Sequence, residues 1–238
     1  MTDKAQTTND PVIDALFSVG AHFGYRRSKR HPTVAPFIFG VKSGVEIFDL
    51  EKTKSSLEKA EEFVRNLAKA GKTLLFVGGK NEAREAVQSG AARLAMPVVS
   101  GRWIGGTLTN FANIRARIDK MLDLIQKREK GELVKYTKKE RLLIDRDVLK
   151  LQEMFGGLVP LKGMPGALFV IDPGKEAIAV TEAKKEGVPV LALASSDCNL
   201  STVDYVIPAN DASRQSIAYF VERIVAAYES GKTPSNSQ

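Results

Sequence analysis

Residues 73–87, TLLFVGGKNEAREAV, decide the fold class of this 238-residue chain. They begin with a compact apolar run at 73–77, which is typical of a buried strand, and then pass through Gly78 and Gly79 into apolar residues at helical spacing. A short apolar strand that leads directly into an amphipathic helix is half of a βαβ unit. The stretch therefore predicts a parallel sheet covered by helices.

The same alternation continues on both sides of this stretch. Further apolar strands are expected at 97–99, 167–171, 188–193 and 205–207. Helices are expected through Leu57, Ala60, Val64 and Leu67, over 176–186, and in a final segment whose start we assign to Asp211 as the N-cap. We therefore predict an α/β fold, an open doubly wound sheet of about five parallel strands.

The N-terminal part departs from this alternation. Asp10 and Pro11 indicate a helix start, with Asp at the N-cap and Pro at the first helical position. Residues 37–41 and 45–50 read as two short strands joined by a turn at 42–44. We expect a short β-hairpin next to a basic, irregular segment.

A second interruption lies between the expected strands at 97–99 and 167–171. Two sets of apolar residues share the spacing 4, 3, 4: Ile114, Ile118, Met121 and Ile125, then Ile144, Val148, Leu151 and Phe155. A capping box at 137–140 starts the second helix. We predict an antiparallel helical hairpin, a short coiled coil, inserted at 111–157. The α/β domain then comprises 10–110 and 158–229, and we expect 1–9 and 230–238 to be disordered.

Composition and charge narrow the function classes. Ordinary apolar content and a length of 238 residues exclude a disordered chain and a disulfide-dependent mini-protein. The single cysteine, Cys198, cannot form an internal disulfide, and no apolar run is long enough for a signal or membrane segment. We expect a cytoplasmic protein. The net charge of +7 indicates a polyanionic partner, with a merely basic surface as the alternative.

The distribution of this charge separates two regions. Residues 113–150 carry twelve Lys and Arg against seven Asp and Glu. Most of these are explained equally well as the solvated face of exposed helices. The run at 26–30 differs, because no acidic residue lies between Ala21 and Val45 and because its arginines suit bidentate phosphate contacts. We favour polyanion contact for this run.

Catalytic and cofactor motifs are incomplete. The loop Gly78-Gly79-Lys80 could receive a phosphate at a helix N-terminus, but it lacks the spacing of a P-loop or of a dinucleotide fingerprint. His22, His31 and Cys198 show no metal-ligand spacing, and a buried thiol explains Cys198 better than a catalytic dyad. We expect no catalytic residue, cofactor, metal, membrane or small-molecule substrate. The alternative is a nucleotide-binding α/β enzyme that uses this loop.

The segment at 101–113 holds the only tryptophan of the chain, Trp103, beside Arg102. An aromatic ring next to a guanidinium group can pack on RNA. The alternative is that Trp103 is a structural anchor where the helical hairpin joins the sheet, with Arg102 pointing outward. Both interpretations can hold together.

Five stretches, taken together, resemble a known family. They are GAHFG at 20–24, IFDLEKT at 47–53, LFVGGK at 75–80, GRWIGGTLTNF at 101–111 and VDYVIPAND at 203–211. In this order and around a helical hairpin, they resemble the second protein of the small ribosomal subunit in its bacterial form. The resemblance covers about residues 12–228. Departures from its usual pattern lie at Tyr25, Gly79, Ser195–Asp197 and Ala212.

This resemblance implies a flavodoxin-like domain with a protruding helical hairpin that binds small-subunit ribosomal RNA and performs no catalysis. It also implies neighbouring ribosomal proteins as partners, including the largest small-subunit protein, which binds messenger RNA. We expect RNA contacts from ten residues on the basic surfaces: Arg26, Arg27, Lys29, Arg30, His31, Lys42, Arg102, Asn110, Lys138 and Lys139.

Overall fold

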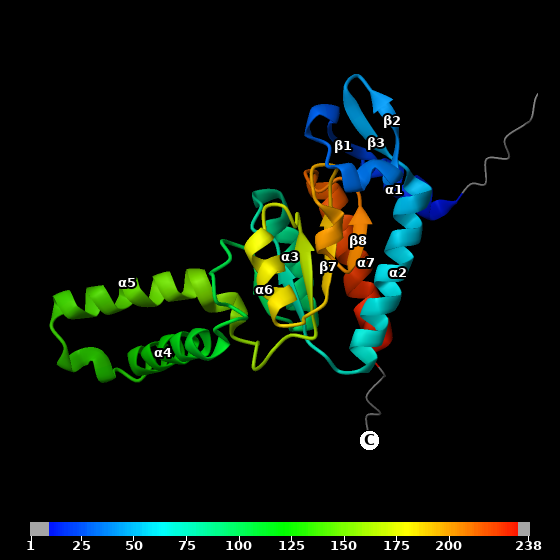
Figure 1. Ribbon diagram of the computed structural model, residues 1–238. Helices are drawn as coiled ribbons and strands as arrows, with labels where there is room; N and C mark the ends of the chain where they lie inside the picture. Colours follow the sequence, from blue (N-terminus) through cyan, green and yellow to red (C-terminus); the bar gives the residue numbers. More distant parts are fainter. Residues whose placement is uncertain (1–9, 233–238) are drawn as a thin grey trace, which may run out of the picture.

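A computed structural model describes residues 10–232 of the chain (Figure 1). The expected disorder at 1–9, and at 233–238 of the tail expected at 230–238, lies outside the described residues. Residues 230 and 231 of that tail instead form the end of the last helix. The division into domains at 110/111 and 157/158 stays a prediction. Across residues 10–232, no helix is both long enough and apolar enough to span a membrane.

A five-stranded parallel sheet forms the centre of the molecule. Its strand order, β5-β4-β6-β7-β8, is the flavodoxin-like order 2-1-3-4-5, so the predicted fold class is confirmed. The strands are β4 (Leu74–Val77), β5 (Val98–Val99), β6 (Ala167–Ile171), β7 (Val190–Ala194) and β8 (Tyr205–Pro208). β4 and β6 pair with Leu75 opposite Leu168, and β6 and β7 pair with Phe169 opposite Leu191.

Helices cover both faces of this sheet, because every residue of β4, β6 and β7 is apolar and buried. One face, with Phe76 and Phe169, packs against α2 (Leu50–Lys69), α3 (Asn81–Leu94) and α7 (Arg214–Gly231). The other face, with Leu75 and Val170, packs against α6 (Ala177–Lys185), Trp103 and the base of the helical hairpin. Adjacent residues of each strand thus enter opposite cores.

The helical hairpin projects from the sheet (Figure 1). It consists of α4 (Phe111–Glu129), the 3₁₀ turn η3 (Glu132–Lys135) and α5 (Lys138–Phe155). The predicted capping box is present: the Thr137 hydroxyl accepts a hydrogen bond from the Glu140 backbone N–H, and the Glu140 carboxylate accepts from the Thr137 N–H. Ile118 and Met121 are buried where α4 joins the core, and Val148 is buried on α5.

A second, antiparallel sheet of three strands covers the carboxyl ends of β7 and β8 (Figure 1). It follows α1 (Pro11–Ser18), and η1 (Arg27–Lys29) and η2 (Pro32–Phe37) lie in its connections. Its strands are β1 (Phe23–Arg26), β2 (Ile38–Lys42) and β3 (Val45–Phe48). The expected β-hairpin is therefore β2–β3, with Ser43 and Gly44 at positive φ in a two-residue turn.

Hydrogen bonds attach this small sheet to the parallel one. The Tyr25 N–H donates to the Ser196 hydroxyl at 2.8 Å, and the His31 N–H donates to the Ser196 carbonyl at 2.8 Å. The Asn210 N–H donates to the Ala21 carbonyl at 2.9 Å. The edge at which open α/β sheets usually bind ligands is therefore covered by the chain itself.

Two local expectations are wrong. The chain at 23–26, read from the sequence as irregular, forms β1, because Phe23 pairs with Ile47 and Arg26 pairs with Val45 of β3. Asp211 does not cap the last helix: α7 begins at Arg214 after the N-cap residue Ser213, and the Asn210 side chain accepts from the Ala212 and Ser213 N–H groups. Asp211 is instead fully buried.

Gly157 fixes the place where the hairpin returns to the sheet. A Cβ atom there would overlap the carbonyl oxygen of Val98 in β5, whereas a Cβ on its neighbour Gly156 would meet nothing within 4 Å. Gly156 has helical φ and ψ of −55° and −40°, which alanine adopts without strain. The two adjacent glycines thus differ in how closely another backbone approaches them.

We expect Gly157→Ala to lower the free energy of unfolding by about 1–3 kcal/mol or more, because backbone atoms must move apart. Gly156→Ala should leave it unchanged or raise it by about 0.4–1 kcal/mol, because alanine restricts the unfolded chain. Urea unfolding of both variants measures the difference. Equal stabilities would contradict the close packing of the hairpin's end on β5.

Candidate functional site

Three of the predicted RNA-contacting residues are exposed together at the end of β1 and in the turn that follows it. Arg26 ends β1, Arg27 and Lys29 lie in η1, and all three side chains are exposed. The Arg27 N–H donates to the Gly44 carbonyl at 3.2 Å, which holds the loop against the β2–β3 turn. Lys42 is also exposed, at the end of β2 on the same small sheet. The structure therefore gathers these four cations on the N-terminal sheet.

Arg30 and His31 differ from these cations because each already has a partner. The Arg30 guanidinium lies 3.3 Å from the carboxylate of Glu46, which is fully buried in β3. The His31 Nδ1 lies 2.8 Å from the Thr33 hydroxyl and accepts from the Thr33 N–H at the start of η2. Both residues hold the loop that carries the free arginines.

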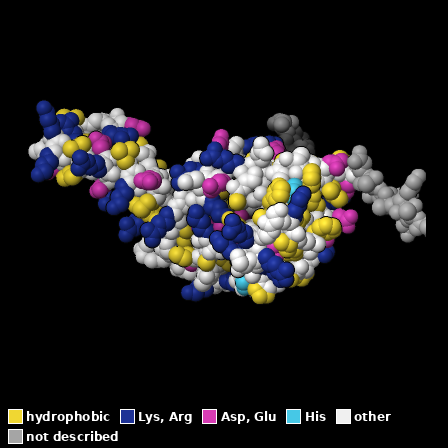
Figure 2. All heavy atoms as spheres, turned by 90° about the horizontal axis from the view of Figure 1, so that it is seen from above, with side chains coloured by type: hydrophobic (Ala, Val, Ile, Leu, Met, Phe, Trp, Pro, Cys, Tyr) yellow, Lys and Arg dark blue, Asp and Glu magenta, His cyan; other side chains and the backbone are white. Residues whose placement is uncertain are grey.

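The remaining candidates lie at the two ends of the helical hairpin. Arg102 and Asn110 are exposed at its base, and Lys138 and Lys139 are exposed in the first turn of α5 at its far end. Figure 2 shows Lys and Arg side chains along the hairpin and over the adjoining part of the body. The structure thus places the ten candidates on three separate surfaces.

Trp103 lies beneath Arg102 and is almost completely buried in the core beside the hairpin base. Its ring N–H donates to the Glu182 carboxylate of α6 at 3.3 Å. The indole is therefore out of reach of an RNA base, and Arg102 alone of this pair faces solvent. Trp103 is thus a buried core residue, and its role as a structural anchor stays a prediction.

The loop after β4, Gly78-Gly79-Lys80, contacts carboxylates from other segments of the chain at the place where a phosphate could bind. The Lys80 ammonium lies 2.5 Å from Asp172 and 3.1 Å from Asp211, and all three side chains are buried. The Gly79 N–H donates to the Glu176 carboxylate at 3.1 Å. A Cβ at position 79 would lie 2.5 Å from that carboxylate, which explains the glycine at this departure from the family pattern.

These contacts decide the protonation of the cluster. Burial alone would lower the pKa of Lys80, but the Asp211 and Asp172 carboxylates outweigh burial and raise it. Burial raises the pKa of Asp211 to about 7, against the opposing effect of Lys80. Burial also raises the pKa of the Cys198 thiol. Lys80 is therefore charged, and Cys198 is a protonated thiol.

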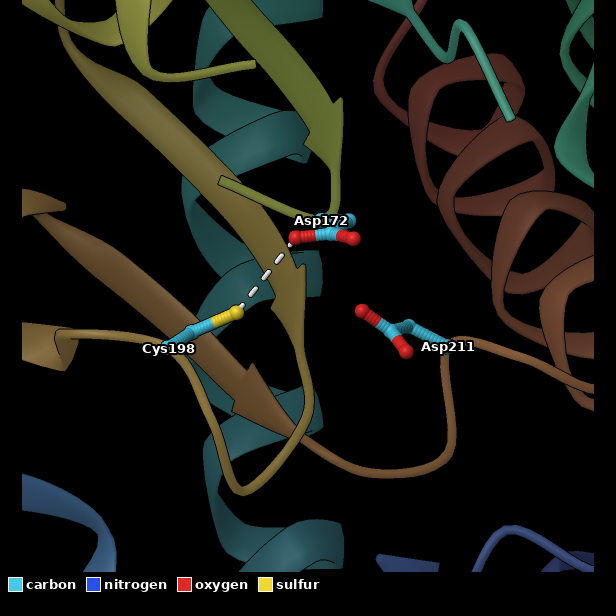
Figure 3. A group of neighbouring side chains, drawn as sticks. All are labelled: Asp172, Cys198 and Asp211. Atoms are coloured by element: carbon cyan, nitrogen blue, oxygen red, sulfur yellow. Dashed lines mark hydrogen bonds between the residues drawn. The ribbon is translucent and has the colours of Figure 1, made fainter. Parts of the chain in front are cut away.

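Asp172, Cys198 and Asp211 point toward one another, with ligand atoms within 4.8 Å (Figure 3). The arrangement does not suit a metal ion, because the Lys80 ammonium already contacts both carboxylates and because metals bind the thiolate rather than the thiol. The sequence analysis missed this cluster. The sequence pattern that could have revealed it is the polar residue after each of β4, β6 and β8, because the carboxyl ends of these strands lie at one edge of the sheet.

The fold and these surfaces define an α/β scaffold. Buried ion pairs fill the edge of the sheet where open α/β sheets usually bind ligands, and other Lys and Arg side chains are exposed on the surface. A sequence model of the ribosomal protein S2 family matches residues 16–231. The small ribosomal subunit protein uS2 of Roseiflexus sp. (strain RS-1) is 42% identical over 223 residues, which is 94% of this chain and 85% of the relative. The uS2 protein of Chloroflexus aurantiacus (strain ATCC 29366 / DSM 635 / J-10-fl) is 39% identical over 228 residues, 95% of this chain and 96% of the relative.

This protein belongs to the ribosomal protein S2 family. The resemblance inferred from the five sequence stretches is confirmed. Nothing supports the alternative of a nucleotide-binding enzyme, because Lys80 and the Gly79 N–H already have carboxylate partners.

We expect Lys80→Met to destabilise the protein by about 3–5 kcal/mol at pH 8, because it leaves two buried carboxylates without a cation. The loss should shrink toward pH 5. Without Lys80, the folded state keeps protons that the unfolded state has released, so its stability falls as pH rises. Urea unfolding at the two pH values tests this. Lys184→Met, at an exposed site on α6, is the control and should change stability little at either pH.

Proposed function

We propose that the protein is a structural component of the small ribosomal subunit that binds ribosomal RNA through basic surfaces and supports translation in the cytoplasm. Family membership supports the ribosomal role. The observation that carries the mode of action is the filled edge of the sheet. Lys80 is paired with buried carboxylates, whereas within residues 10–232 no carboxylate forms an ion pair with Arg26 or Arg27, which face outward. The protein acts as a scaffold and performs no catalysis.

The N-terminal loop is the principal RNA contact in this proposal. Arginine forks make bidentate contacts with phosphates, and such contacts fix position without reading sequence. Arg26, Arg27 and Lys29 are exposed on a loop that is held by the Arg30–Glu46 ion pair and by the His31 N–H. A held loop loses less conformational entropy on binding than a free one.

The hairpin supplies a second contact. Lys138 and Lys139 lie at the start of α5, at the end of the hairpin farthest from the sheet (Figure 1). Arg102 and Asn110 lie at its base. A projecting arm with cations at both ends can reach RNA segments that are far apart, and recognition then rests on RNA shape.

Neighbouring ribosomal proteins are the second class of partner. Four large apolar side chains are exposed on α1 and the small sheet: Phe17, Phe23, Phe39 and Val41. Figure 2 shows hydrophobic side chains gathered on the side of the body away from the hairpin. Exposed aromatic groups in such numbers are typical of protein-protein contacts. We assign this aromatic surface to the docking of the largest, messenger-RNA-binding protein of the small subunit.

The RNA contact is tested by the triple variant Arg26→Ala, Arg27→Ala and Lys29→Ala. We expect its affinity for a small-subunit ribosomal RNA fragment to fall by about tenfold or more near physiological salt, with a flatter dependence on salt because fewer counterions are released. Filter binding at several salt concentrations measures both effects. The control removes the same charge from exposed helix positions: Lys69→Ala, Lys184→Ala and Lys185→Ala. Equal losses in the two triple variants would contradict a local contact.

The aromatic surface is tested by Phe39→Ala. Phe39 is 81% exposed, so its truncation should leave the fold and the RNA affinity intact. Small subunits reconstituted with the variant should bind the messenger-RNA-binding protein about tenfold more weakly, as loss of a central aromatic contact predicts. Leu149→Ala, 62% exposed on α5, is the matched control. Unchanged binding in both variants would remove this docking assignment.

A further inference from the structure

Glu182 is a buried carboxylate whose partners all come from one loop. It lies in α6 and faces the chain between β5 and α4. One oxygen accepts from the Gly106 N–H at 2.7 Å and from the Trp103 ring N–H at 3.3 Å. The other accepts from the Leu108 N–H at 3.0 Å, the Thr109 N–H at 3.3 Å and the Thr109 hydroxyl at 3.4 Å.

These hydrogen bonds keep the carboxylate ionised. Burial alone would raise the pKa of Glu182, but the N–H groups of Leu108 and Gly106 and the Trp103 ring N–H outweigh it and lower the pKa. A buried charge is tolerated only when donors replace its water. The loop in turn depends on Glu182, because its N–H groups need an acceptor.

The loop itself has no regular secondary structure. Residues 100–110 contain neither helix nor strand, and Gly106 has a positive φ of 89°. Yet this loop carries exposed Arg102 and Asn110 and leads directly into α4. Its conformation therefore sets the direction of Arg102 and the base of the hairpin.

The same loop forms a wall of two clefts at the hairpin base. One cleft, of about 770 Å³, is lined by Arg84, Arg102 and Lys150, with Glu153 as its one carboxylate. The other, of about 810 Å³, is lined by Asn110, Arg117 and Lys120. Ile104 of the loop lines both. Cationic rims on both clefts suit a phosphate backbone.

We propose that Glu182 is a positioning residue: it serves as a built-in anion that holds the 100–110 loop so that Arg102 and the cleft rims are ready for RNA. This inference rests on the proposed function and adds to it the residue that organises the hairpin base. Because Glu182 occupies the Gly106, Leu108 and Thr109 N–H groups, phosphate contacts are left to the exposed side chains. Binding then does not have to order the loop.

Glu182→Gln tests the proposal, because it keeps the shape but turns a donor toward the loop's own donors. We expect the amide hydrogens of Gly106, Leu108 and Thr109 to exchange about tenfold faster, as lost hydrogen bonds allow local opening. We also expect affinity for the ribosomal RNA fragment to fall about fivefold or more. Glu176→Gln, a second buried carboxylate at the start of the same helix, is the control and should change neither measurement.

A double-mutant cycle with Arg102→Ala shows whether Glu182 acts through that side chain. The two losses of RNA affinity should be non-additive, because Arg102 that is already displaced by Glu182→Gln contributes little binding for Arg102→Ala to remove. Additive losses, or faster exchange with unchanged affinity, would overturn the proposal. If Arg102→Ala alone binds as tightly as the original protein, the RNA contact at the hairpin base fails, whatever Glu182 does.

A milder variant covers the case in which Glu182→Gln does not fold. Trp103→Phe keeps most of the buried ring and deletes only the ring N–H donor to Glu182. We expect smaller changes in the same direction, in both amide exchange and affinity. No change in either measurement for this variant, with Glu182→Gln unfolded, would count against a positioning role.

Discussion

The ammonium group of Lys80, shared between Asp172 and Asp211, is the constraint on which the rest of the molecule depends. It joins the ends of β4 and β6 to the turn after β8 at the edge where open α/β sheets usually bind ligands. Charges buried there must be paired inside the chain. The ion pairs at this edge thus connect chain segments instead of lining a ligand pocket. The sheet then serves as the framework that carries the exposed surfaces.

Once this edge is closed, other parts of the chain can be built upon it. The small antiparallel sheet attaches there through Ser196 and Asn210, and it carries Arg26 and Arg27 on one loop. On one face of the parallel sheet, α6 supplies Glu182 to the loop that starts the hairpin. In both places a buried acceptor holds a loop whose cations point outward. In the proposed function, these buried acceptors hold the loops ready for contact with a polyanion.

The sequence predicted the elements whose signal is local. Apolar runs such as 167–171 became strands, and the capping box at 137–140 became a helix start, because both depend on neighbouring residues alone. β1 was missed because its four residues, FGYR, show no strand pattern of their own and become a strand only through pairing with β3. Asp211 was assigned as a helix cap, since nothing near it in the chain reveals Lys80.

By itself, the sequence determined the class of fold, the presence of the helical hairpin and the family, because periodicity and ordered motifs survive without coordinates. Only the tertiary structure decided which charges are free. Lys80 and Arg30 look like Arg27 in the sequence, but folding places carboxylates beside the first two and, in the part of the chain that the structure describes, pairs none with the third. The physical reason is that burial and pairing depend on residues distant in the chain, and these decide whether a cation can meet a phosphate.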